Sequence, residues 1–331
     1  MILLYCVLAL LSQPSQSTKV DWEKVCPAKH WQTYTWLNES EILVGDGHPS
    51  MRSVLKGFKI VNVKTNKSRS DFPLQTRFQE LLKRSEYDWG GDIRYMIHKV
   101  QQRMMYIVIA TREKYPTFNV LRWDMKHSKV LELPTLVHYG LGIGVPKDVD
   151  RFFALEIPQY NGQRYDTILE YSLDKNPPSV KKIRSPIPLD TKNSRGLLLG
   201  ADKTGSLIVL FIEPNQESTT LTVFTIAMNA GTLDIHPYTL LLKSLKPYYY
   251  YYELSHDGSQ ILFRTIVLSA DEEITNVYLF DTKCKHINRL MSFKSTGDFE
   301  PEPYAFNWTL DDKYISFIHE GYLYKKRASF K

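Results

Sequence analysis

Short apolar segments recur along this chain at nearly regular spacing, and each is followed by a second apolar segment that ends in polar residues. The second segments begin at residues 59, 119, 168, 222 and 276, so the steps between them are 60, 49, 54 and 54 residues. Units of about 50 residues with three or four short strands are typical of β-propeller blades. A β-sandwich with evenly spaced strands is the alternative. The first segments, with the pattern of short buried strands, begin at Glu41, Met105, Arg151, Leu207, Gln260 and Lys313.

The turns between these strands follow a pattern of their own. Asp257-Gly258 stands immediately before an alternating strand, where a tight hairpin turn requires a positive φ. The same pattern returns about one repeat later, with Asp312 in the place of the glycine. Both turns are therefore expected to join two strands of the same blade.

Two of the second segments end in an aspartate, Asp124 after Trp123 and Asp281 after Phe280. Together with the Asp-Gly turn, they resemble the Ser-Pro-Asp-Gly repeats of TolB-like, WD40-like (PD40-type) β-propellers. His256 stands where that family usually has proline. The resemblance implies the propeller fold but no particular function, because this fold carries many functions.

The length fits six blades of roughly 52 residues, and seven blades are the alternative. A propeller must pair its last blade with its first or leave an exposed sheet edge. The last repeat lacks an outer strand, and residues 18–25 could supply it, so we predict a ring closed by the N-terminal strand. Phe78, Leu81 and Leu82 recur at helical spacing after Pro73 and predict a short helix over residues 74–85, between the first two blades.

The first residues suit a secretory signal peptide. The apolar run from Met1 to Leu11 is too short to span a bilayer, Pro14 follows it, and small residues precede a cleavage site near Thr18. A buried first strand is the alternative. We therefore divide the chain into a signal peptide (1–17) and one propeller domain (18–331). We expect a secreted or periplasmic protein without a transmembrane span.

Without the signal peptide two cysteines remain, Cys26 and Cys284. In an oxidising compartment they could form a disulfide bond between the start of the domain and a late repeat. Two free thiols are an equally good interpretation, because the spacing of the cysteines does not distinguish a disulfide bond from free thiols.

Composition changes this picture little. The 331 residues are 43% hydrophobic and 24% charged with a net charge of +6, as in an ordinary folded protein. The basic residues are dispersed, so we predict no nucleic-acid partner. The 21 Tyr, 15 Phe and 6 Trp favour strands.

No nucleophile elbow, phosphate-binding loop or zinc motif is present in the sequence. We therefore predict no catalytic residues, no metal site and no cofactor. The most conspicuous local feature is the run of five tyrosines at positions 248–252, which precedes the Asp-Gly turn. Core packing between blades is its simplest interpretation. Alternatively, one face of the strand contributes to an aromatic ligand site at the channel mouth, with the candidate residues Tyr248, Tyr250, Tyr252 and His256.

These observations favour a monomeric, non-enzymatic, exported propeller that binds a protein or peptide, or a carbohydrate, on one rim. The alternative is a hydrolase or lyase that uses side chains from several blades at the channel mouth. Clustered carboxylates or histidines at one channel mouth would favour the enzyme, and a broad exposed aromatic patch would favour binding.

Overall fold

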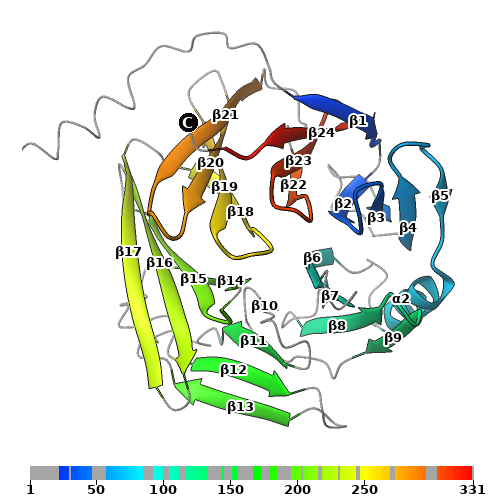
Figure 1. Ribbon diagram of the computed structural model, residues 1–331, viewed down its shortest axis with the longest axis horizontal. Coiled ribbons are helices and arrows are strands. Elements are labelled where there is room, and N and C mark those ends of the chain that lie inside the picture. Colours follow the sequence, from blue (N-terminus) through cyan, green and yellow to red (C-terminus); the bar gives the residue numbers. More distant parts are fainter. Residues whose placement is uncertain are drawn as a thin grey trace, which may run out of the picture.

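The computed structural model confirms an all-β β-propeller (Figure 1). The signal peptide predicted at residues 1–17 lies outside the described residues. Among the described residues, no helix combines the length and the apolar character needed to cross a membrane. The structure describes residues 22–329 except 30, 47–56, 85–91, 100–103, 112–116, 133–142, 145–150, 156–166, 173–178, 185–194, 203, 215–217, 230–231, 244–246, 269–272 and 296–303.

The described strands form six antiparallel four-stranded sheets, which we number in chain order. Within each sheet, the strands are given from the one nearest the axis to the outermost. Sheet 1 contains β2 (Trp31–Trp36), β3 (Glu41–Asp46), β4 (Gly57–Asn62) and β5 (Ser68–Arg69). Sheet 2 contains β6 (Asp92–Lys99), β7 (Met104–Thr111), β8 (Thr117–Asp124) and β9 (Lys129–Glu132). Sheet 3 contains β10 (Ile143–Gly144), β11 (Arg151–Leu155), β12 (Thr167–Ser172) and β13 (Ser179–Arg184).

The other three sheets come from the second half of the chain, with one strand added from its start. Sheet 4 contains β14 (Arg195–Ala201), β15 (Leu207–Pro214), β16 (Ser218–Asn229) and β17 (Thr232–Lys243). Sheet 5 contains β18 (Pro247–Leu254), β19 (Gln260–Leu268), β20 (Glu273–Asp281) and β21 (Ile287–Ser295). Sheet 6 contains β22 (Tyr304–Trp308), β23 (Tyr314–His319), β24 (Tyr322–Arg327) and, outermost, β1 (Glu23–Pro27).

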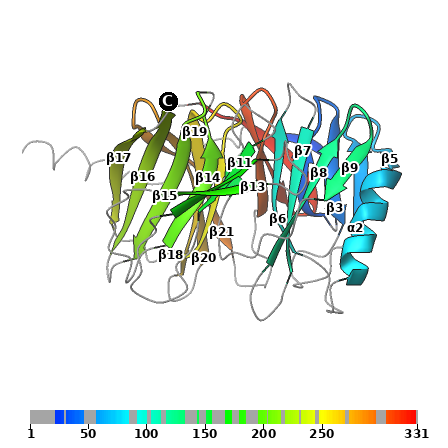
Figure 2. The same ribbon diagram turned by 90° about the horizontal axis from the view of Figure 1, so that it is seen from below.

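The sheets are arranged around a common axis with their first strands innermost (Figure 1). Contacts between innermost strands follow the order β6, β2, β22, β18, β14 and β10. Sheets 5, 6, 1 and 2 are therefore consecutive neighbours. The described residues contain no seventh sheet, so the seven-blade alternative has no support. Figure 2 shows the sheets from the side, with their strands running between two rims.

The fourth strand of sheet 6 comes from the N-terminal segment, which the sequence predicted as the source of the outer strand that the last repeat lacks. The prediction placed this strand at residues 18–25, whereas β1 spans Glu23–Pro27 and pairs antiparallel with β24. Trp22 precedes β1, and its ring lies 5.0 Å from that of Phe293 in sheet 5 and 5.2 Å from that of Phe317 in sheet 6. The start of the domain therefore packs against two neighbouring sheets.

The turns between the third and fourth strands share one side-chain arrangement in sheets 1, 2 and 5. The third strand ends in Asn62, Asp124 or Asp281, whose side-chain oxygen accepts bonds of 2.8–3.1 Å from the backbone N–H groups two and three positions later. This is the capping that makes Asn and Asp favourable in turns. The residue four positions later has a positive φ in each case: Asn66 at 59°, Ser128 at 49° and Lys285 at 58°.

The predicted short helix is present as α2 (Phe72–Arg84), between sheets 1 and 2. The Asp71 carboxylate accepts a 3.1 Å bond from the backbone N–H of Leu74 and caps the first turn. Leu74, Phe78 and Leu81 are buried in a core cluster that also contains residues of β3, β4, β7 and β8. The helix therefore covers the outside of the junction between these two sheets.

Candidate functional site: the turns of sheets 4, 5 and 6

Three consecutive sheets present similar turns between their first and second strands, all at the same rim. Each turn is closed by a backbone hydrogen bond of 2.9–3.0 Å, from Asp202 to Ser206, from Ser255 to Gln260 and from Thr309 to Tyr314. Each contains one residue with positive φ: Gly205 at 88°, Gly258 at 71° and Asp312 at 55°. The predicted equivalence of Asp312 and Gly258 is therefore confirmed.

The turn of sheet 5 is stabilised internally by the carboxylate of Asp257. One of its oxygens accepts bonds from the Ser255 hydroxyl (2.8 Å), the Ser259 hydroxyl (2.6 Å) and the Ser259 backbone N–H (2.9 Å). Burial acts to raise the pKa of Asp257, but the hydrogen bonds from Ser259 and Ser255 outweigh it and hold the pKa below its usual value. The Ser255 hydroxyl in turn accepts a 3.0 Å bond from the Gln260 N–H.

The turn of sheet 6 repeats this arrangement at equivalent positions. The Asp311 carboxylate accepts bonds from the Thr309 hydroxyl (2.7 Å) and the Lys313 N–H (3.2 Å). Burial acts to raise the pKa of Asp311, and the hydrogen bonds from Thr309 and Lys313 again lower it below the usual value. Thr309 and Asp311 therefore correspond to Ser255 and Asp257 of sheet 5.

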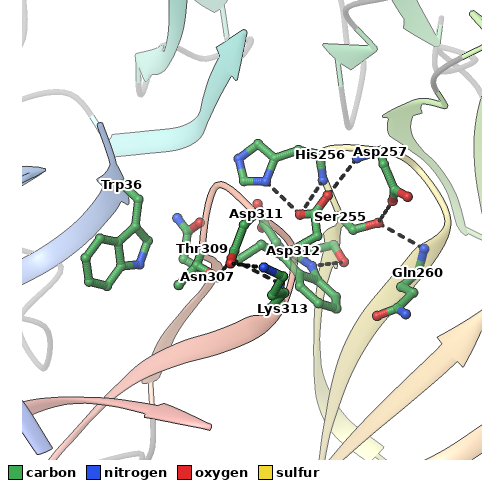
Figure 3. Close-up of polar contacts among 12 residues, drawn as sticks. Trp36, Ser255, His256, Asp257, Gln260, Asn307, Thr309, Asp311, Asp312 and Lys313 are labelled. Carbon is green, nitrogen blue, oxygen red and sulfur yellow. Dashed lines mark hydrogen bonds and ion pairs between the residues drawn. The ribbon is translucent and has the colours of Figure 1, made fainter. Parts of the chain in front are cut away.

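The carboxylate of Asp312 joins these two turns (Figure 3). Its Oδ1 accepts the backbone N–H of His256 at 2.9 Å, and its Oδ2 accepts that of Asp257 at 2.9 Å. The Nδ1 atom of the His256 ring lies 2.9 Å from the same Oδ1. The side chains of His256 and Asp312 are 21% and 17% exposed, so solvent screens this pair only in part.

Gly258 makes the corresponding contact on the other side, with the turn of sheet 4. A Cβ atom added to Gly258 would lie 2.3 Å from the Asp202 Cα, a separation that real atoms do not tolerate. Glycine is therefore required here both for the positive φ and for this close approach. The turns of sheets 4, 5 and 6 form one connected row, which we call the turn row: Asp202–Ser206, Ser255–Gln260 and Thr309–Tyr314.

A buried hydrogen-bond network joins sheet 6 to sheet 1. The Ser316 hydroxyl oxygen accepts bonds from the Trp36 Nε1 (2.8 Å) and the Tyr34 hydroxyl (2.9 Å), and donates one to the Asn307 carbonyl (3.1 Å). The Asn307 amide donates to the Tyr34 carbonyl at 2.7 Å. Trp308 makes a similar contact with sheet 5, since its Nε1 donates to the Glu253 carbonyl at 3.3 Å.

In the turn row, the Ser255 hydroxyl and the His256 ring bond to different carboxylates. A catalytic serine would bond to a histidine base, whereas the Ser255 hydroxyl bonds to Asp257 and the Nδ1 of His256 lies beside Asp312. Within the described part of the chain, His, Cys, Asp and Glu side chains form no group of three that could hold a metal ion.

The tyrosine run lies on β18, the innermost strand of sheet 5. Tyr250 pairs with Thr265 of β19, and Tyr252 pairs with Phe263. Tyr252 packs against the core cluster between sheets 4 and 5. The side chains of residues 248–251 lie outside the described residues, so the aromatic ligand site stays a prediction. Of the four candidate residues, the structure places only His256 in the turn row.

The two cysteines do not form the disulfide that the sequence left open. Cys26 is buried on β1, and Cys284 is exposed in the turn between β20 and β21, and both are free. Burial raises the pKa of the Cys26 thiol to about 11. One thiol points into the core of sheets 1 and 6 while the other lies on the rim of sheet 5, so the pairing does not form.

Sequence reasoning missed the role of the Asp312 side chain. Its one signal was that an aspartate replaced glycine at a position with positive φ, which indicates that the carboxylate has a use of its own. Ser316, Tyr34 and Trp36 gave no comparable signal.

No protein-family model matches the chain, and no curated protein matches it. Similar solved structures include a proposed 6-phosphogluconolactonase from Bacteroides uniformis ATCC 8492, with 10% identity and a TM-score of 0.42 over 85% of this chain and 89% of that one. A second proposed 6-phosphogluconolactonase, from Bacteroides fragilis NCTC 9343, has 12% identity and a TM-score of 0.40 over 92% and 89%. TolB from Acinetobacter baumannii has 10% identity and a TM-score of 0.38 over 88% and 77%. Likenesses this distant carry no argument about function.

Proposed function

We propose that this chain is an exported, non-enzymatic β-propeller that binds a protein or peptide partner on the rim formed by the turn row. The observation that carries the proposal is the direct contact from turn to turn along the row. Asp312 fixes two backbone N–H groups of the neighbouring turn, and Gly258 abuts Asp202.

Such a row is suited to binding because its backbone is ordered before any partner arrives. Ordering a loop upon association costs free energy, so a surface whose turns are already fixed loses less of it. The Asp257 and Asp311 carboxylates are used to hold their own turns. The partly exposed His256 ring is available at the surface of the row.

The proposal includes a closed ring of six blades, one for each four-stranded sheet. Pairing of β1 with β24 supports this, because it joins the start of the domain to its last hairpin. The hydrogen bonds between Ser316, Tyr34 and Trp36 support it further, since they join sheets 6 and 1. We propose export through a signal peptide at residues 1–17, which N-terminal sequencing of the secreted product would test.

Site-specific photo-crosslinking tests the binding proposal. We call the rim that carries the turn row the turn rim. A photoreactive amino acid is placed on the turn rim at Glu39, Thr204 or Lys283, and on the opposite rim at Lys29 or Glu320, all of which are exposed positions. We expect one partner to be crosslinked from the turn rim and not from the opposite rim. Equal crosslinking from both rims, or none, would contradict the proposal.

Tyr248 stays within the proposal as a contributor to an aromatic site at the channel mouth. It belongs to the innermost strand of sheet 5, which leads directly into the turn row. We expect Tyr248→Ala to weaken binding of the crosslinked partner without unfolding the protein. An unchanged affinity would remove Tyr248 from the site.

A further inference from the structure

Exposed basic residues occupy equivalent positions in the outer turns of three sheets. Lys64, Lys126 and Lys283 each lie two residues after the capping residue of their turn, and all three are exposed. A second exposed lysine follows four or five residues after each capping residue, at positions 67, 129 and 285. Dispersed along the sequence, these lysines gave no sign of a basic surface, but the fold brings them to one rim.

Sheet 6 adds two exposed cations at the same rim. Lys313 lies in the turn between β22 and β23, and Arg327 pairs with Tyr314 at the end of β24. Sheets 5, 6, 1 and 2 are consecutive neighbours (Figure 1), so the eight cations follow one another around the rim. We call them the basic arc: Lys64, Lys67, Lys126, Lys129, Lys283, Lys285, Lys313 and Arg327.

Within the described part of the chain, close ion pairs neutralise little of this charge. Among the described residues, the only ion pair within 4 Å that involves the arc joins Lys313 to Asp311, at 3.5 Å and largely exposed. The Asp124 and Asp281 carboxylates cap their own turns, and the charge of Lys283 is close enough to Asp281 to help lower the pKa of that carboxyl. The ammonium group of Lys285 lies over the Tyr238 ring at 5.2 Å, a contact that leaves its positive charge in place.

Exposed carboxylates lie closer to the axis, where Lys313 is the one member of the basic arc. The turns between first and second strands carry the exposed carboxylates of Glu39 and Asp311, and the partly exposed carboxylate of Asp257. A broad anionic surface such as a membrane would face these carboxylates and the basic arc at once. A narrow acidic chain can follow the cations from turn to turn and leave Glu39 and Asp257 uncovered. The arrangement therefore favours an acidic polypeptide over a lipid surface.

We propose that the partner of this rim is an acidic polypeptide segment, rich in Asp and Glu, that binds along the basic arc. This inference rests on the proposed function and specifies the chemistry of the partner. Exposed charges contribute mainly to the association rate and to specificity, so binding is expected to weaken as salt is raised.

The test uses a fluorescent oligoglutamate peptide as the probe and the chain without residues 1–17. The variant K64Q/K126Q/K283Q removes one cation from each of three arc turns. The matched control K29Q/K83Q/K181Q removes three exposed lysines outside the arc. We expect the arc variant to bind the probe about fivefold more weakly or worse, and the control to bind as the unmodified chain does. Unchanged thermal midpoints would show that both variants are folded.

Equal loss of binding in both variants would overturn the inference, because it would show that binding depends on the net charge of the protein and not on the position of the lysines. Tighter binding of heparin, or of vesicles containing phosphatidylserine, than of oligoglutamate would also overturn it. A partner crosslinked from the turn rim whose affinity K64Q/K126Q/K283Q leaves unchanged would refute the inference alone. Absence of crosslinking from that rim would instead refute the proposed function.

Discussion

Replacement of Asp312 tests whether neighbouring turns are held together by its carboxylate. Asp312→Ala removes the acceptor for two backbone N–H groups, those of His256 and Asp257, each at 2.9 Å. Hydrogen bonds to a charged group contribute about 1.5–3 kcal/mol each, and the partial exposure of the carboxylate places these at the low end. The expected loss is about 3 kcal/mol, because Asp312 already has a positive φ of 55° and alanine bears a similar backbone cost there.

Asp312→Gly separates the two effects. Glycine at a positive φ recovers about 1 kcal/mol relative to alanine but loses the same hydrogen bonds. We therefore expect a loss of about 2 kcal/mol, smaller than for alanine but not zero. Asp311→Asn is the control, because Asp311 bonds only within its own turn, and we expect it to cost less than about 1 kcal/mol.

The measurements are urea unfolding and hydrogen exchange of single amides. Exchange at the His256 and Asp257 amides should become faster in both Asp312 variants and remain unchanged in the Asp311 control. If Asp312→Gly were as stable as the unmodified protein, with both amides still protected, the link between the turns would contribute nothing and the reasoning would be refuted.

Three further predictions concern other parts of the fold. The Cys284 thiol should react rapidly with a maleimide while buried Cys26 reacts only on unfolding, as mass spectrometry after brief labelling would show; a Cys26–Cys284 disulfide would contradict it. Burial acts to raise the pKa of Asp281, but hydrogen bonds outweigh it and lower the pKa overall. The ionised Asp281 carboxylate therefore stabilises the fold above its unfolded-state pKa of about 4, and this stabilisation is lost as the pH falls. Asp281→Asn should therefore keep most stability at neutral pH, as Asn62 does in sheet 1, and reduce the acid sensitivity of unfolding. Deletion of residues 18–30 removes β1 and should destabilise the fold by about 3 kcal/mol or more; unchanged melting would refute it.

Local interactions explain how much of the fold could be predicted from the sequence. The caps of Asp124 and Asp281 involve residues only two and three positions away, so they leave a repeated signal in the sequence. The helix was predicted at residues 74–85 and spans 72–84, because Asp71 sets its start. The N-terminal strand was predicted from a missing partner alone, and its position was therefore several residues in error.

The candidate site depends on contacts that local pattern does not encode. Asp312 and His256 are 56 residues apart, and Trp36 and Ser316 are 280 residues apart. Each pair meets only because neighbouring sheets pack side by side around the axis. The pairing of Cys26 with Cys284 could not be decided from the sequence for the same reason. Only the three-dimensional fold shows that one cysteine lies in a core and the other on a rim.

The outer turns show how folding and binding constraints divide within a few residues. The capping residue of each turn is fixed by folding, because its side chain accepts the backbone N–H groups that reverse the chain. The residue two positions later donates its backbone N–H to that cap, and no hydrogen bond of the cap requires a lysine side chain, although in sheet 5 the charge of Lys283 helps to lower the pKa of Asp281. Lysine nevertheless stands at this position in sheets 1, 2 and 5. Since the hydrogen bonds of the cap do not require lysine there, its recurrence on one rim is what the proposed acidic partner leads us to expect.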